Sequence, residues 1–172
     1  AFRLIEGGCD PLLIARRLVV HASEDVGMAD PNALVVAVSA LTAFEKLGAP
    51  EGLIPLSNAI IYVCEAEKSN SVILAMDGAK RAAHEAAEAP VPPYLRDNSY
   101  GSAADKAQSA NYKYPHNFGG WVEQQYLPDA LRNEVFYRPQ GRGFEKTVAE
   151  VRRRKGMRDD TLPTPPAGRP HP

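Results

Sequence analysis

The sequence predicts an all-α domain, and three observations carry this prediction. Apolar residues recur every three or four positions through residues 1–89, which is the spacing of one helix face. Two Asp-Pro pairs, at Asp10 and Asp30, start such stretches, because aspartate caps a helix and proline fits its first turn. Residues 1–89 also lack the period-two alternation of a half-buried strand. We divide the 172 residues into a helical domain, 1–156, and a tail, 157–172.

The first two predicted helices follow these Asp-Pro pairs. CDPLLIARRLVVHASEDVG ends at Gly27, and ADPNALVVAVSALTAFEKLG ends at Gly48, since glycine commonly terminates helices. Helical spacing predicts buried stripes in both helices: Leu12, Ala15, Val19, Ala22 and Val26 in the first, and Leu34, Ala37, Val38, Leu41 and Phe44 in the second.

Between these helices, SEDVGMADP predicts a hydrogen-bonded corner. Glu24 and Asp25 fall near a helix C-terminus, where the helix dipole disfavours negative charge. We expect Arg16, Arg17 or free backbone N–H groups near Asp30 to offset them.

Two more helices are expected before residue 90. APEGLIPLSNAIIYVCEAEKS is the third, with Pro55 in its first turn or at a kink. SNSVILAMDGAKRAAHEAAEA is the fourth, capped by Ser69 or Ser71 and favoured by its alanines. One face of this fourth helix is predicted to carry Val72, Met76, Ala79 and Ala83.

The helical pattern of the sequence ends at residue 90. Pro90, Pro92 and Pro93 exclude a continued helix, so residues 90–140 are predicted to be an irregular segment wrapped on the helices. SAADKAQSA, residues 102–110, suits a short helix inside it, and NEVFYRP suits an extended stretch. GRGFEKTVAEVRRRKG predicts a last, basic helix within residues 141–156. The tail has five prolines in its last twelve residues and is expected to be flexible.

Charge and cysteine content narrow the class of protein. The net charge is −1, but residues 132–172 carry ten Lys/Arg against five Asp/Glu, so the body is acidic and the end basic. The two cysteines, Cys9 and Cys64, suit reduced thiols in a cytoplasmic protein, with a disulfide as the less favoured alternative. No apolar run approaches the roughly 20 residues of a membrane span. The start, AFRLIEGGCDP, reads as the middle of a helix, so we expect a piece of a longer protein.

Signals of catalysis are weak. A GxxxxGKS/T phosphate loop is absent, and Lys80 in DGAKRA lies in a predicted helix. His21 and Asp25 share a helix face, where a hydrogen bond or ion pair is favoured over a metal site. His116 lies among aromatic residues, which leaves a hydrolase as one hypothesis, although a nucleophile in a recognisable setting is lacking.

The stretch NYKYPHNFGGWVEQQYLPDAL, residues 111–131, concentrates the aromatic residues. It holds Trp121, the chain's single tryptophan, with Tyr114 and Tyr126 among its other rings. Rings interleaved with proline and glycine more often build a packed loop or a subunit contact than a catalytic loop. The basic run Arg152, Arg153, Arg154 and Lys155, with Arg142 and Lys146, is the strongest nucleic-acid signal and predicts backbone contacts rather than base reading.

Five blocks together resemble one known family. DPLLIARRLVVHASEDVGMADPNAL, GLIPLSNAIIYVCEAEKSN, VPPYLRDNSY, YKYPHNFGGWVEQQYLPD and VFYRPQGRGFE occur here in the order of the replication-associated recombination protein A (MgsA) family, AAA+ ATPases related to Werner-helicase-interacting ATPases. The resemblance covers roughly residues 1–154 and implies the C-terminal region, a helical collar that assembles tetramers. The ATPase core, with its ATP and Mg²⁺, would lie outside this chain, so catalytic, cofactor and metal residues are not expected here.

The resemblance also implies partners and a location. Family members act at stalled replication forks with DNA and single-stranded DNA-binding protein, so a cytoplasmic, nucleoid-associated protein is expected. We predict self-association into a homotetramer as the function of this chain, and DNA binding by the basic helix as the alternative. The candidate self-contacts are Trp121, Tyr114, Tyr126, Met76 and Ala79.

Overall fold

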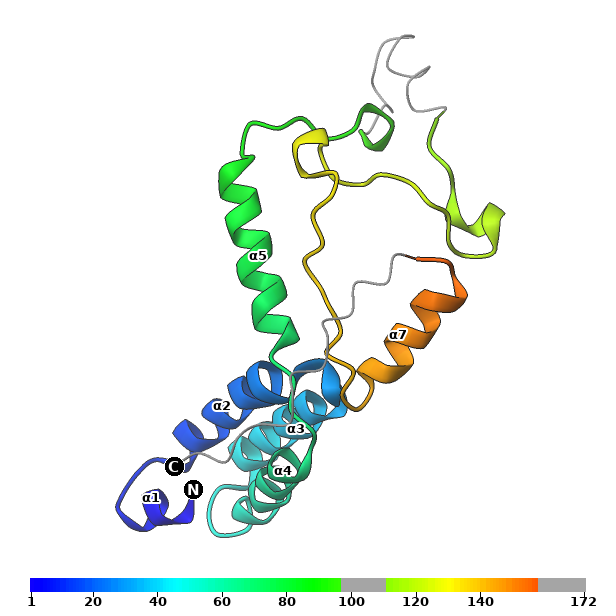
Figure 1. The fold of residues 1–172 in the computed structure, drawn as a ribbon. Coiled ribbons are helices and arrows are strands. Elements are labelled where there is room, and N and C mark those ends of the chain that lie inside the picture. The colour runs from blue at the N-terminus through cyan, green and yellow to red at the C-terminus, as the bar shows by residue number, and fades with distance from the viewer. Residues whose placement is uncertain (97–110, 158–172) are drawn as a thin grey trace, which may run out of the picture.

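The structure is a computed structural model, and it describes residues 1–96 and 111–157. Every regular element among these residues is helical, so the predicted all-α class is confirmed (Figure 1). The α-helices are α1 (Phe2–Glu6), α2 (Pro11–His21), α3 (Asn32–Leu47), α4 (Leu53–Glu65), α5 (Ser71–Glu85) and α7 (Glu145–Arg154). No helix among the described residues is long and apolar enough to cross a membrane.

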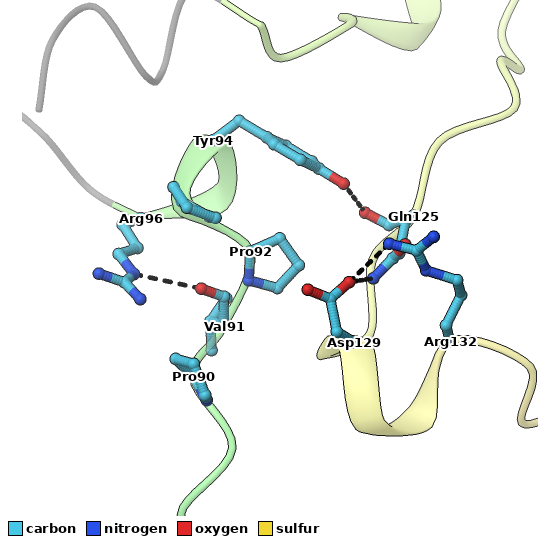
Figure 2. A pocket seen from close by; sticks show the side chains of 9 residues that line it. Pro90, Val91, Pro92, Tyr94, Arg96, Gln125, Asp129 and Arg132 are labelled. Atoms are coloured by element: carbon cyan, nitrogen blue, oxygen red, sulfur yellow. Dashed lines mark hydrogen bonds and ion pairs between the residues drawn. The ribbon is translucent and has the colours of Figure 1, made fainter.

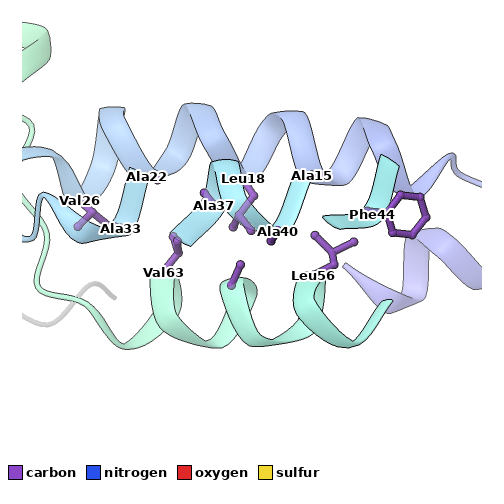
Figure 3. Packing of buried hydrophobic residues seen from close by; sticks show 11 residues of the cluster. Ala15, Leu18, Ala22, Val26, Ala33, Ala37, Ala40, Phe44, Leu56 and Val63 are labelled. Atoms are coloured by element: carbon purple, nitrogen blue, oxygen red, sulfur yellow. The ribbon is translucent and has the colours of Figure 1, made fainter. Parts of the chain in front are cut away.

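The core lies between α2, α3 and α4, which Figure 3 shows side by side. Both predicted caps form: Asp10 Oδ1 accepts from the Leu12 N–H at 2.9 Å, and Asp30 Oδ1 accepts from the Asn32 N–H at 3.0 Å. Small side chains let the helices approach closely, since alanine supplies much of the buried surface. The buried cluster is Ala15, Leu18, Ala22, Val26, Ala33, Ala37, Ala40, Phe44, Leu56, Ala59 and Val63.

The predicted stripe of α3 is partly wrong. Leu34 and Val38, expected in the core, are 40% and 43% exposed. Ala33 and Ala40 are buried in their place. Because α3 is apolar around most of its circumference, periodicity alone allowed either face to turn inward. The close approach to α2 and α4 selected the small residues.

The predicted corner between α2 and α3 is present, but Asp25 has a different partner from the expected arginines. The chain continues from α2 through a π-helical turn, η1 (Ala22–Val26), and a 3₁₀ turn, η2 (Gly27–Ala29). Asp25 Oδ2 lies 2.5 Å from His21 Nδ1, so His21, rather than Arg16 or Arg17, is the partner of Asp25. The predicted local His–Asp interaction is therefore confirmed.

Helix α5 leaves the bundle and projects away from it (Figure 1). Most of its predicted apolar face does not pack inside the described part of the chain, because Met76 is 42% exposed and Ala79 and Ala83 are exposed as well. Val72, at the start of that face, is half-buried beside Gly27. The buried residues of α5 are Ser71, at its first turn, and Ala82.

Between α5 and α7, the described residues are irregular apart from three short 3₁₀ turns: η3 (Pro93–Leu95), η4 (Pro115–Phe118) and η5 (Asp129–Leu131). Residues 111–131 lie away from the bundle of α2, α3 and α4, with η5 near the far end of α5, and the chain then returns toward the bundle (Figure 1). On the way back, Phe136 lies close to Gly78 of α5. The short helix predicted at residues 102–110 and all but the first residue of the predicted tail fall outside the described residues.

Candidate interaction surfaces

A buried carboxylate joins α7 to the rest of the domain. The Glu145 side chain is fully buried, and its Oε1 accepts hydrogen bonds from the hydroxyls of Ser69 at 3.0 Å and Ser71 at 2.6 Å. Its Oε2 accepts from the Gln140 N–H at 2.9 Å, and the Tyr137 hydroxyl lies 3.4 Å from Oε1. A buried carboxylate needs such donors to offset its lost hydration. We call these five residues the Glu145 joint.

Main-chain contacts extend this joint to the corner before α3. The Phe144 N–H donates to the Ala29 carbonyl at 2.7 Å, and the Gly143 N–H donates to Glu67 Oε2 at 2.9 Å. Gly143 has φ +48°, and a Cβ there would overlap the Ala29 carbonyl oxygen. Glycine is therefore required for the two chain segments to approach this closely.

Tyr137 connects the joint to the basic helix. The Arg152 guanidinium lies 5.0 Å from the centroid of the Tyr137 ring, and its Nη1 donates to the Tyr137 carbonyl at 3.3 Å. Burial, followed by the negative charge and hydrogen bonding of Glu145, raises the pKa of Tyr137 to about 12. Tyr137 therefore stays neutral and acts as a donor through the physiological range.

A pocket of about 310 Å³ lies between residues 90–96 and 125–132 (Figure 2). The Tyr94 hydroxyl closes it by donating to the Gln125 carbonyl at 2.5 Å. Asp129 accepts from Gln125 and Arg132, and these two contacts lower its pKa. Among the described residues that line the pocket there is no serine, threonine, cysteine, histidine or lysine, and its two potential nucleophiles, Tyr94 and Asp129, are both engaged in hydrogen bonds. The Tyr94–Gln125 hydrogen bond connects the two loops, and the contacts of Asp129 with Gln125 and Arg132 hold the second loop together.

The outer faces of the bundle carry aliphatic residues. Val35 of α3 is 62% exposed, and Ile54 and Ile61 of α4 are 72% and 63% exposed. Leu34 and Val38 adjoin Val35 on α3, and the isoleucines lie two turns apart on one face of α4. Exposed aliphatic groups that cluster in this way are typical of protein contact surfaces. From the sequence, Leu34 and Val38 were assigned to the core, and Val35, Ile54 and Ile61 were not singled out.

The aromatic stretch is largely exposed within this chain. Tyr112, Tyr114, Phe118 and Tyr126 are 40–54% exposed, and Trp121 is half-buried. The His116 ring tilts against Tyr114, with centroids 5.0 Å apart. His116 is exposed and does not line the pocket of Figure 2, so the geometry gives no support to a hydrolase centred on it. Packing of these rings on the chain's own helices is not observed for the four exposed ones, and their role as subunit contacts stays a prediction.

The predicted basic patch divides into two groups. Arg153, Arg154 and Lys155 are exposed at the C-terminal end of α7. The other members contact groups of the chain itself: Arg152 contacts Tyr137, Arg142 donates to the Lys68 carbonyl, and Lys146 lies 3.9 Å from Glu67. Arg142 and Arg152 are partly buried, whereas Lys146 stays 67% exposed, so the exposed cations of the patch are Lys146, Arg153, Arg154 and Lys155.

Neither a metal-binding cluster nor a disulfide is found in the part of the chain that the structure describes. Those residues hold no group of three or more His, Cys, Asp or Glu side chains that could bind a metal. Cys9 and Cys64 are both free thiols.

Comparison with known proteins decides the family. The family described as "MgsA AAA+ ATPase C terminal" matches residues 1–155. The chain belongs to this family. It is 46% identical, over 87% of its length, to "Replication-associated recombination protein A" of Bacillus subtilis, and 45% identical, over 86%, to an uncharacterized Thermotoga maritima protein. It is also 34% identical, over 91% of its length, to "ATPase WRNIP1" of Dictyostelium discoideum.

This MgsA-family chain covers only part of each relative. It spans 36% of the Bacillus protein, 24% of the Thermotoga protein and 18% of the Dictyostelium protein. The resemblance inferred from the five sequence blocks is confirmed, including the relation to Werner-helicase-interacting ATPases. The chain thus corresponds to the C-terminal region of an AAA+ ATPase family.

Proposed function

We propose that this MgsA-family domain binds copies of itself, as a homotetramer, and thereby clusters the ATPase portions of a longer protein. The observation that supports this proposal is the exposure of Val35, Ile54 and Ile61, each more than 60% accessible in the single chain. Complete burial of such a side chain stabilises an interface by about 1.5–3 kcal/mol. A few of these residues from each copy would supply the apolar centre of a contact.

Clustering has a direct mechanistic value for an ATPase of this type. Tethered ATPase portions meet at an effective concentration set by the tether, without a bimolecular search. ATP and Mg²⁺ would bind in those portions, because the phosphate-loop pattern is absent from this sequence. The chain itself would then perform no catalysis.

The relatives' names support a setting for this assembly. One relative is named a replication-associated recombination protein, so we propose that the longer protein acts in replication-associated recombination. DNA and single-stranded DNA-binding protein are the partners that this role entails. Two free thiols suit the reducing cytoplasm.

Light scattering of the purified chain tests self-association. At about 50 µM chain, well above a micromolar Kd, the mass should be four times 18.7 kDa. A mass of 18.7 kDa under these conditions contradicts the proposal. The mass of a dimer would support self-association but would exclude the tetramer.

The second candidate function is DNA binding by α7, supported by the exposure of Arg153, Arg154 and Lys155. Contacts to duplex phosphates predict a log–log salt slope of about −0.9 for each phosphate neutralised. Replacing all three by alanine should lower the magnitude of this slope by about 2–3. An unchanged slope excludes this surface, and Arg142→Ala is the matched control because that guanidinium bonds to Lys68.

A further inference from the structure

Four large apolar side chains are exposed at one end of the helical bundle. Phe2 and Leu4 of α1, Leu13 of α2 and Leu47 of α3 are 44%, 57%, 50% and 58% exposed. We call these four residues the apolar end. Large apolar side chains that lie near one another on an exposed surface are typical of a contact with another part of a protein.

The arrangement of the helices brings these residues to the same end. Figure 3 shows Phe44 of α3 at one end of the core and Val26 at the other. Leu47 lies about one turn beyond Phe44. Helix α2 runs toward Val26, which follows it in η1, so Leu13 in its first turn lies at the Phe44 end. Figure 1 shows α1 at this end as well, beside the start of α2.

Helix α1 has little packing of its own. It has five residues, and none of them is buried. A helix this short is unstable in isolation, because formation of its first turn is unfavourable. The Cys9 N–H donates to the Leu4 carbonyl at 3.0 Å and thereby joins α1 to the start of α2. This bond positions α1 but leaves Phe2 and Leu4 about half-exposed, so we expect a further surface to cover them.

Chain connectivity selects the occupant of the apolar end. The matched family is a C-terminal region, and the chain covers 36% of the Bacillus relative, so a larger portion would precede this domain in a longer protein of that kind. That portion would enter at residue 1, next to Phe2 and Leu4. A portion joined by a short tether is present at an effective concentration of about 1 mM. Four side chains then suffice for docking, whereas a contact between free proteins uses about 20–30 residues on each side.

We propose that the apolar end is the docking surface for the ATPase portion that precedes this domain in the longer protein. The four side chains would pack against an apolar surface of that portion. Docking there fixes the orientation of the ATPase portion on the bundle, so that its nucleotide site is held in a defined direction and not on a loose tether. The proposal rests on the proposed function, because it treats the chain as the C-terminal part of an ATPase, but it does not require the tetramer.

The two free cysteines of the chain provide the test. Cys9 lies at the apolar end, between α1 and α2, whereas Cys64 lies near the C-terminal end of α4. The rate of alkylation by N-ethylmaleimide is measured at each cysteine by peptide mass spectrometry, in the isolated chain and in the longer protein. Docking that leaves about 10% or less of the open form should slow the alkylation of Cys9 at least tenfold in the longer protein. Cys64 should react at the same rate in both proteins.

Charged substitutions then locate the docking surface. Leu4→Glu and Leu13→Glu in the longer protein should each raise the Cys9 rate about tenfold, to that of the isolated chain, because docking would desolvate an unpaired carboxylate. Leu74→Glu is the matched control, since Leu74 is 49% exposed in the first turn of α5, away from the apolar end, and should keep Cys9 protected. Circular dichroism of each variant of the isolated chain should show unchanged helix content, because all three positions are exposed.

Four results would overturn the docking surface. The first is an equal Cys9 rate in the isolated chain and the longer protein. The second is release of Cys9 by Leu74→Glu but not by Leu4→Glu or Leu13→Glu. The third is a lower mass of the isolated chain after Leu4→Glu on light scattering, which would assign the apolar end to a contact between copies. The fourth is faster alkylation of Cys9 in the isolated chain after removal of residues 158–172, which would assign it to the tail.

The two proposals fail in different ways. The mass of the unmodified isolated chain tests self-association without reference to the apolar end. The Cys9 rate in the longer protein tests docking whether or not the domain forms a tetramer.

Discussion

The carboxylate of Glu145 accepts a hydrogen bond of 2.6 Å from the hydroxyl of Ser71, which lies 74 residues earlier in the chain. This contact links the first residue of α7 to the first residue of α5. Both residues are buried, so the bond forms away from water and fixes where the last helix begins. The start of α7 is held by this bond together with the other contacts of the Glu145 joint and the Phe144–Ala29 main-chain bond.

Glu145→Ala should lower the free energy of unfolding by about 2–4 kcal/mol. The substitution leaves the Gln140 N–H and two serine hydroxyls without their buried acceptor, and each unsatisfied group costs about 1–3 kcal/mol. Urea unfolding followed by circular dichroism measures the change. Glu150→Ala, at an exposed position of the same helix, should stay within about 0.5 kcal/mol. Equal losses in the two variants would show that the joint contributes nothing.

Gly143→Ala should be more destabilising than Gly141→Ala, although both glycines have positive φ. Each alanine incurs about 1–2 kcal/mol of left-handed backbone strain. At Gly143 the added Cβ also overlaps the Ala29 carbonyl, whereas at Gly141 it meets open space. We expect the unfolding free energies to differ by about 2 kcal/mol or more. Indistinguishable values would mean that the contact with Ala29 relaxes without cost.

The helical half of the fold could be predicted from local sequence because its signals are local. The Asp10 and Asp30 caps act on N–H groups two residues away, and glycine stops follow the apolar stretches. The choice of buried face on α3 is not local. Val38 and Ala37 were equally compatible with the core by spacing, and the close packing of α2 and α4 buried the alanine.

The joint could not be predicted for the same reason. Glu145 follows a glycine-rich turn and starts a basic helix, which is the signature of an exposed helix-capping acid. Its hydroxyl partners lie 74 and 76 residues away, beyond the reach of any spacing argument. The aromatic stretch was recognised as special from its composition, but composition could not tell burial from exposure.

The pH dependence of Tyr137 offers a test of the joint in solution. Its folded pKa, about 12, exceeds the usual value of about 10 for tyrosine in an unfolded chain. The neutral phenol is thus favoured in the fold, so its contribution is complete below pH 10 and is lost as the pH rises toward 12. Ultraviolet titration should show one tyrosinate forming near pH 12 that Tyr137→Phe removes. Titration of every tyrosine near pH 10 would mean that this ring is solvated.

Val35→Glu should reduce the mass of the assembly toward that of one chain while leaving helix content unchanged. Val35 is 62% exposed in the single chain, so a carboxylate there meets water and does not disturb the core. In a subunit contact the same carboxylate would be desolvated without a partner, at a cost of several kcal/mol. Light scattering and circular dichroism of the same sample provide both readouts. Ala87→Glu adds the same charge at an exposed position outside the predicted self-contacts and is expected to leave the mass unchanged. An unchanged mass for Val35→Glu, together with dissociation by Ala79→Glu, would move the contact to α5.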